Sequence, residues 1–236
     1  MNAKTAFGWG VLCWVFYLSA RTAIQHLVLA TDYASNVRQD ELITLFRLAC
    51  ALAASFIYWR CWTLKELLQW KRTAAWVWLG GLLLIAGNLT HALAYRQPAW
   101  FDWRVIGIDW VVAFNEEVSY RGLFQRSLME WKGKAWAEWG GSLMFTAMHL
   151  GYQPLSRMGY IFLWGLAAAK LRSRGAAMGS LIIIHWLADS ADVVCWKKSA
   201  EPLPSLEWVS VGCLLVVLGL AWLYGRERVR PPAMAV

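Results

Sequence analysis

Residues 113–124 read AFNEEVSYRGLF, and they place three charged side chains inside the apolar segment 105–126. The three are Glu116, Glu117 and Arg121. A charge at the centre of a bilayer costs roughly 2.5–3.5 kcal/mol on insertion scales, so charged residues in a membrane helix must face protein or water. The stretch therefore predicts a membrane helix with one side turned toward a polar interior.

The rest of the chain is also apolar. Of its 236 residues, 59% are hydrophobic and 16% are charged, whereas roughly 25% of residues are charged in soluble domains. A bilayer core about 30 Å thick requires about 20 apolar residues per helix. The charge boundaries predict such helices at 5–29, 42–62, 73–95, 105–126, 135–153, 156–172, 175–195 and 207–225. We expect an all-α polytopic integral membrane protein of about eight transmembrane helices, forming a single domain over 1–236.

Basic residues fall in short clusters between the apolar segments, which is typical of topology signals and argues against a nucleic-acid-binding face. Loops predicted on one side of the membrane hold about twice as many Lys and Arg residues as loops on the other side. This bias predicts that both termini are cytoplasmic, and the short chain with basic loops suggests a bacterial inner membrane. The five cysteines form no CxxC pair, so neither a disulfide framework nor a zinc knuckle is expected.

Polar side chains also interrupt other predicted helices, and they are Asn88, His91, Asp109, His149, His185, Asp189 and Asp192. Glu117 and Arg121 are four residues apart in the order that favours an ion pair on one helical face. Glu116 lies about 100° around the helix from Glu117, so it should face a different partner. His185 and Asp189 are also four residues apart. The carboxylate could therefore orient the imidazole, or both groups could face a substrate.

Three motifs in this order resemble the CAAX protease and bacteriocin-processing family of intramembrane glutamic proteases, which are related to the type II CAAX prenyl endopeptidases. The motifs are EExxxR at Glu116 to Arg121, FxxxH at Phe145 to His149 and HxxxD at His185 to Asp189. The YRGLF that follows the two glutamates is also typical of the first motif. Some family members have HxxxN in place of the last motif. The resemblance spans residues 105–195, and the ordered set on separate apolar segments is more specific than any one motif.

The resemblance implies an endopeptidase that hydrolyses a membrane-associated peptide with an activated water, without a metal or other cofactor. By similarity the catalytic residues are Glu116, His149, His185 and Asp189, and the residues that support the site are Glu117, Arg121 and Phe145. Glu116 and His149 would hold and deprotonate the water, while His185 and Asp189 would lie on the oxyanion side. Because a carboxylate donates a hydrogen bond only when protonated, we expect Asp189 to orient His185 or to be neutral.

The expected partners are the lipid bilayer and a membrane peptide or protein. A prenylated C-terminus, a bacteriocin leader and a C-terminal sorting signal are equally compatible with the sequence.

Two other interpretations of the same residues stay open. The histidines and carboxylates could bind zinc in a three-ligand site of a zinc-dependent membrane protease, although the chain lacks HExxH. A non-enzymatic small transporter or immunity-type membrane protein could also use these residues for proton coupling or partner binding. A serine or cysteine mechanism has little support because the chain lacks GxSxG.

Overall fold

The computed structural model describes residues 1–27, 33–62, 73–98, 103–150, 153, 155–193, 196–198 and 204–224. The helices in these ranges are α1 (Ala3–Leu27), α2 (Tyr33–Cys61), α4 (Ala75–Tyr95), α5 (Trp103–Glu116), η1 (Glu117–Phe124), α6 (Gln125–Lys132), α7 (Lys134–Met148), η2 (Leu155–Arg157), α8 (Met158–Ser173), α9 (Met178–Val193) and α10 (Pro204–Tyr224). The architecture is all-α, as expected. The sequence did not indicate one addition, a short antiparallel ribbon of β1 (Arg96–Pro98) and β2 (Trp196–Lys198).

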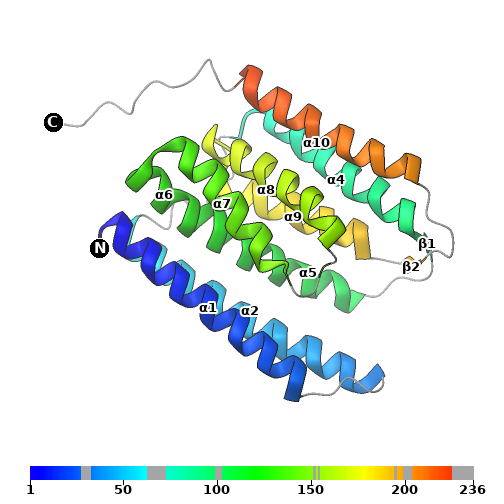
Figure 1. The fold of residues 1–236 in the computed structure, drawn as a ribbon, viewed down its shortest axis with the longest axis horizontal. Helices are drawn as coiled ribbons and strands as arrows, with labels where there is room; N and C mark the ends of the chain where they lie inside the picture. Colours follow the sequence, from blue (N-terminus) through cyan, green and yellow to red (C-terminus); the bar gives the residue numbers. More distant parts are fainter. Residues whose placement is uncertain are drawn as a thin grey trace.

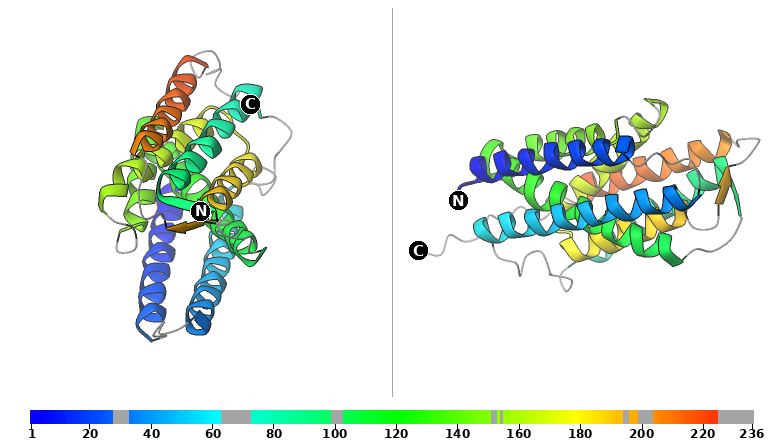
Figure 2. Two further views of the ribbon diagram at one scale, coloured as in Figure 1. Left: turned by 90° about the vertical axis from the view of Figure 1, so that its right-hand side faces the viewer. Right: turned by 90° about the horizontal axis from the view of Figure 1, so that it is seen from below.

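The helices form three layers (Figure 1). α1 and α2 make an antiparallel pair on one side, α4 and α10 make another on the opposite side, and α5 to α9 lie between them, as the views in Figure 2 also show. The start of α1 and the end of α10 lie at the same end of the bundle, where α6 turns into α7. We call this the α6–α7 end, and the opposite one, which carries the ribbon, the β1–β2 end.

Two apolar clusters join the layers. The larger one includes Val77, Leu84, Leu171, Ile184 and Leu214, which come from α4, α8, α9 and α10. The smaller one joins α1 and α2 to η1 and α9. α4 and α9 approach closely at Gly81, where an added Cβ would overlap Cδ1 of Ile184. Burial against the neighbouring layers therefore fixes the middle layer on both sides.

Each of the eight predicted membrane segments overlaps a helix, counting α5, η1 and α6 as one continuous rod. By length and apolar composition, two helices among the described residues could cross a membrane, Ala3–Leu27 and Glu41–Cys61. α7 has 15 residues and α8 has 16, which gives lengths of roughly 22–24 Å, below the 30 Å of a bilayer core. The number of eight transmembrane helices stays a prediction.

Large apolar side chains remain exposed along α1, α2, α4, α7 and α10. They include Leu12, Phe16, Leu45, Phe56, Leu82, Leu143, Leu215 and Trp222. Contiguous exposed apolar surface of this extent is rare on soluble monomers and marks contact with lipid or another protein. These helices thus present the surface expected of a protein embedded in a bilayer.

The rod that carries the acidic pair is helical throughout, as expected, but one part of it is not a regular α-helix, which the sequence did not indicate. Residues Glu117–Phe124 form a π-helix, and the N–H of Gln125 bonds to the carbonyl of Tyr120, five residues earlier. π-turns inside α-helices occur frequently at functional sites. The change of helix type falls directly after Glu116, so the two adjacent glutamates belong to different helical geometries.

Candidate active site

A cavity of about 270 Å³ opens in the middle layer. The side chains that line it come from α2, α4, α5, α7, α8, α9 and the segment after α7, and they are Arg47, Asn88, Ile108, Asp109, Val112, Glu116, Phe145, His149, Gln153, Arg157, Tyr160, Ile161, Trp164, His185 and Asp189. The four residues expected to be catalytic are all among them. Residues that are far apart in the sequence thus meet around one cavity, whose lining includes polar and apolar side chains.

The adjacent glutamates have different surroundings. Glu116, the last residue of α5, lines the cavity and places Oε2 3.7 Å from Nε2 of His185. Glu117 is fully buried and lies outside the cavity lining. Its Oε1 accepts a hydrogen bond from Nδ1 of His185 at 2.8 Å, and its Oε2 lies 3.7 Å from Nε of Arg121. Glu117 therefore contacts the expected arginine and, in addition, an imidazole on another helix.

His185 is held between carboxylates at both ring nitrogens. Glu117 is at Nδ1, while Oδ2 of Asp189 lies 3.3 Å from Nε2. Because a carboxylate only accepts, Nδ1 of His185 carries a proton. Nε2 is the nitrogen that faces the cavity, since its contacts are to Glu116 and Asp189, which line it. The ring of Trp164 packs against the imidazole with ring centroids 4.4 Å apart. The sequence suggested Asp189 as the residue that orients His185, whereas the fully buried contact to this ring comes from Glu117.

His149 lies at the end of a shortened helix. The predicted segment 135–153 ends as a helix at Met148, and His149 is its C-cap. Nδ1 of His149 lies 2.9 Å from the carbonyl oxygen of Phe145, which can only accept, so this nitrogen donates. In the neutral ring Nε2 is then left as an acceptor. The end of α7 thus presents an imidazole with a defined tautomer at the cavity.

Arg121 supports the site from behind. Its guanidinium lies over the ring of Phe145 at 4.5 Å and near that of Trp164 at 5.8 Å, and it donates to the carbonyl of Gly165 at 3.4 Å. Such cation–π contacts partly replace hydration of a buried cation. Arg121 is buried and does not line the cavity. Its contacts instead join η1 to α7 and α8.

Phe145 is the centre of the aromatic packing beside the site. Its ring stacks on Trp164 at 5.7 Å and lies 4.8 Å from the ring of His149. This packing depends on Gly165, because a Cβ there would lie 2.9 Å from Cδ1 of Phe145. The close approach of α7 and α8 therefore sets the position of the wall beside both histidines.

The cavity also contains polar residues to which the sequence analysis gave no role. Asp109, which is two helical turns before Glu116 on α5, is buried, and its Oδ2 has no hydrogen-bond partner within the described residues. Tyr160 donates to Oδ1 of Asn88 at 2.6 Å. Arg47 donates to the hydroxyl of Tyr17 at 2.9 Å. Asp109 and Asn88 had been noticed as polar residues in apolar segments, but local spacing could not connect them to the histidines.

Two further polar residues singled out by the sequence, His91 and Asp192, have side chains that lie outside the described residues. Among the described residues, no group of three His, Cys, Asp or Glu side chains is arranged to hold a metal ion.

Comparison with known proteins gives one match. Residues 98–191 match the family described as type II CAAX prenyl endopeptidase Rce1-like. No curated protein matches the chain, and neither does any solved structure. The matched range contains α5, η1, α7 and most of α9, and so all four candidate catalytic residues. The family consists of membrane proteases, in agreement with the exposed apolar helices. Residues 98–191 of this protein are therefore an Rce1-like domain of the CAAX protease and bacteriocin-processing family.

Proposed function

We propose that this protein is an intramembrane endopeptidase that hydrolyses a membrane-associated peptide with an activated water molecule. The observation that carries the proposal is that Glu116, His149, His185 and Asp189, from three helices, line one cavity of about 270 Å³. A water molecule occupies roughly 30 Å³ of liquid, so a space of this size admits several waters or a short piece of peptide. The Rce1-like match supports the reaction class.

Glu116 is the proposed general base. Its carboxylate takes a proton from a water molecule that Nε2 of His149 holds by accepting the second hydrogen bond. The water oxygen attacks the carbonyl carbon of the peptide bond, and the carbonyl electron pair moves to the oxygen. A positioned base of this kind contributes roughly 10²–10⁴-fold to the rate. Glu116 suits this role because it faces the cavity while Glu117 is occupied by His185 and Arg121.

His185 is the proposed donor to the oxyanion. Glu117 at Nδ1 and Asp189 at Nε2 provide an acceptor for each N–H of the doubly protonated ring. When substrate is bound, the N–H at Nε2 of His185 can donate its hydrogen bond to the developing oxyanion in place of Asp189. The tetrahedral intermediate then collapses, the C–N bond breaks, and Glu116 returns its proton to the leaving nitrogen. The products are a carboxylic acid and an amine.

We propose that the α6–α7 end faces the cytoplasm of a bacterial cell, with both termini on that side. α1 begins and α10 ends there, and this end carries the basic residues Lys132, Lys134, Lys170 and Arg174. Basic residues in short loops favour the cytoplasmic side. Reporter fusions at the two termini test this orientation.

Cleavage assays with designed variants test the function. The purified protein in liposomes is incubated with prenylated C-terminal peptides, bacteriocin leader peptides and C-terminal sorting peptides, each with and without a chelator. We expect cleavage of at least one of these peptides by the wild type. Glu116→Gln and His149→Ala should each abolish it while keeping the thermal unfolding transition. Glu130→Gln is the matched control, because this carboxylate is exposed and pairs with Arg126 away from the cavity.

The outcomes separate the remaining alternatives. Cleavage that the chelator abolishes, and added zinc restores, would replace the proposed mechanism by a zinc-dependent one. Proton-coupled flux that Glu116→Gln eliminates, with no proteolysis in either form, would indicate a transporter. Cleavage that persists in Glu116→Gln would contradict the assignment of the base.

A further inference from the structure

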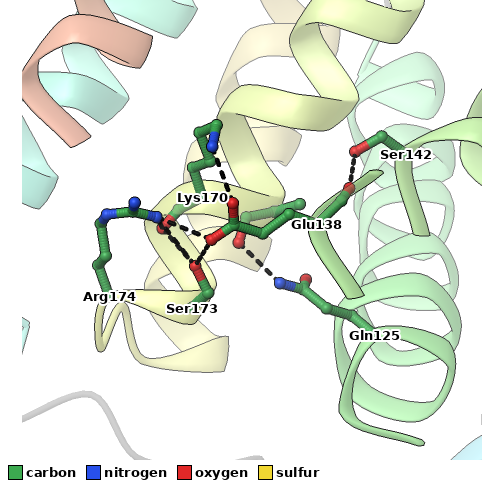
Figure 3. Close-up of polar contacts among 7 residues, drawn as sticks. Gln125, Glu138, Ser142, Lys170, Ser173 and Arg174 are labelled. Atoms are coloured by element: carbon green, nitrogen blue, oxygen red, sulfur yellow. Dashed lines mark hydrogen bonds and ion pairs between the residues drawn. The ribbon is translucent and has the colours of Figure 1, made fainter. Parts of the chain in front are cut away.

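A second cluster of charges lies at the α6–α7 end, about three helical turns before His149 on α7 (Figure 3). Glu138 accepts from Nζ of Lys170 at 2.8 Å and from Nη1 of Arg174 at 2.8 Å, and Ser173 donates to the same carboxylate. The backbone carbonyl of Glu138 accepts a hydrogen bond from the hydroxyl of Ser142. One carboxylate of α7 is thus surrounded by the last turn of α8.

The cluster contains more positive than negative charge. Lys170 and Arg174 both contact the Glu138 carboxylate, and Lys134 lies one helical turn before Glu138 on α7, so it adds a third cation to the same part of the helix. Glu138 is nearly buried, and Lys170 and Arg174 are 20% and 12% exposed. The Nε of Arg174 is buried and has no hydrogen-bond partner within the described residues. An excess of cations in a partly desolvated place favours the binding of an anion.

The start of α7 adds donors to the same place. Its N-cap is Gly133, whose φ of 91° is a conformation that glycine tolerates, and no side chain caps the helix. The first N–H groups of a helix lack intrahelical acceptors, and the helix dipole favours a negative charge beside them. Lys134 is the first residue of this helix, and Glu138 is one turn further along. The helix terminus and the cations therefore act on the same region.

Exposed aromatic side chains lie on the same turns of α7, on another face of the helix. Trp136 is 64% exposed and Trp139 is 51% exposed, and their spacing puts both on one face of α7. Tryptophan is enriched at the level of lipid headgroups in membrane proteins. Trp139 also packs on Phe162 of α8. The cations thus lie near the depth at which lipid phosphates are found.

We propose that the cluster of Lys134, Lys170, Ser173 and Arg174 at the start of α7 binds the phosphate of an anionic phospholipid. The bound headgroup would balance the cations that Glu138 leaves uncompensated and would stabilise the contact between α7 and α8. The inference depends on the protein lying in a membrane and is independent of the peptidase mechanism.

Lipid titration followed by native mass spectrometry tests the proposal. Phosphatidylglycerol or phosphatidylcholine is added to the full-length protein in a neutral detergent, and the bound fraction is measured. A basic residue near an anionic surface contributes roughly 1 kcal/mol, so Lys134→Gln should weaken phosphatidylglycerol binding about five-fold. Arg60→Gln is the matched control, because Arg60 is an exposed cation near the end of α2, which also lies at the α6–α7 end of the bundle. It should leave the binding unchanged.

A variant that should bind the lipid more tightly, rather than more weakly, keeps the test independent of folding. Glu138→Gln removes the competing carboxylate, so it should tighten phosphatidylglycerol binding even if it lowers thermal stability. Equal retention of the two lipids, equal losses in Lys134→Gln and Arg60→Gln, or weaker binding in Glu138→Gln would each overturn the proposal. A further arm adds inorganic phosphate. Stabilisation by phosphate without retention of phosphatidylglycerol would identify a site for a soluble anion and would also overturn the lipid assignment.

Discussion

Gly165 lies where α8 crosses the ring of Phe145, and replacing it by alanine tests the geometry of the whole site. The added Cβ would lie 2.9 Å from Cδ1 of Phe145, 3.6 Å from Cγ and 3.7 Å from Cε1. The first distance is several tenths of an ångström too short for van der Waals contact. The ring must therefore rotate, or α7 and α8 must separate. Both movements displace a side chain that packs against His149, Trp164 and Arg121.

The expected effects follow from this overlap. Overpacking of this kind costs roughly 1–3 kcal/mol of stability. A shift of about 1 Å in a catalytic group can reduce the rate about 10²-fold, so we expect Gly165→Ala to reduce kcat by roughly ten-fold to 10²-fold. Thermal unfolding in detergent gives the stability, and cleavage of whichever peptide the wild type hydrolyses gives kcat. The unfolding measurement needs no substrate.

Two further variants make the result specific. Gly159 lies on the same helix, and a Cβ added there would meet no atom within 4 Å, so Gly159→Ala should be neutral or stabilising, by up to about 1 kcal/mol. Phe145→Leu combined with Gly165→Ala should recover part of the lost stability because the smaller side chain leaves room for the methyl group. Wild-type stability and activity in Gly165→Ala alone would refute the reasoning, since the two helices could not then be in this contact.

Three other substitutions test separate contacts, each by thermal unfolding. Glu117→Gln removes a buried charge whose partners stay behind, so it should destabilise by roughly 3–5 kcal/mol and lower kcat by disturbing His185. Glu138→Ala leaves two cations without their carboxylate; since these are partly exposed, we expect a smaller loss of roughly 1–2 kcal/mol. Trp186→Phe removes the hydrogen bond from the indole to the carbonyl of Ile106 and should cost about 1 kcal/mol.

Each of these predictions can fail independently. A loss for Glu117→Gln no larger than that for Glu138→Ala would mean that the buried contact to His185 is weaker than its geometry indicates. An unchanged unfolding temperature in Trp186→Phe would mean that the hydrogen bond from the indole to the carbonyl of Ile106 adds no measurable stability.

Local spacing predicted those parts of the site that one helix can define. The separation of Glu117 from Arg121 and of His185 from Asp189 predicted contacts within a helix, and these pairs lie 3.7 Å and 3.3 Å apart. Both contacts follow from helical periodicity, because residues four apart in a helix are neighbours on its surface. The same periodicity gave no sign of the π-helix, because nothing in the sequence alone indicates where a turn widens.

The sequence by itself determined the apolar helices, the order of the motifs and the family to which they point, because these depend on composition and short-range spacing. Only the tertiary structure decided that Glu117 bonds to His185, 68 residues away, and that Trp164 packs against the same ring. It also brought Asp109 and Tyr160 to the same cavity as the histidines. These contacts depend on the rotation and depth at which one helix packs on another. Close approaches such as Gly165 on Phe145 fix that register, and the periodicity of a single helix contains no information about it.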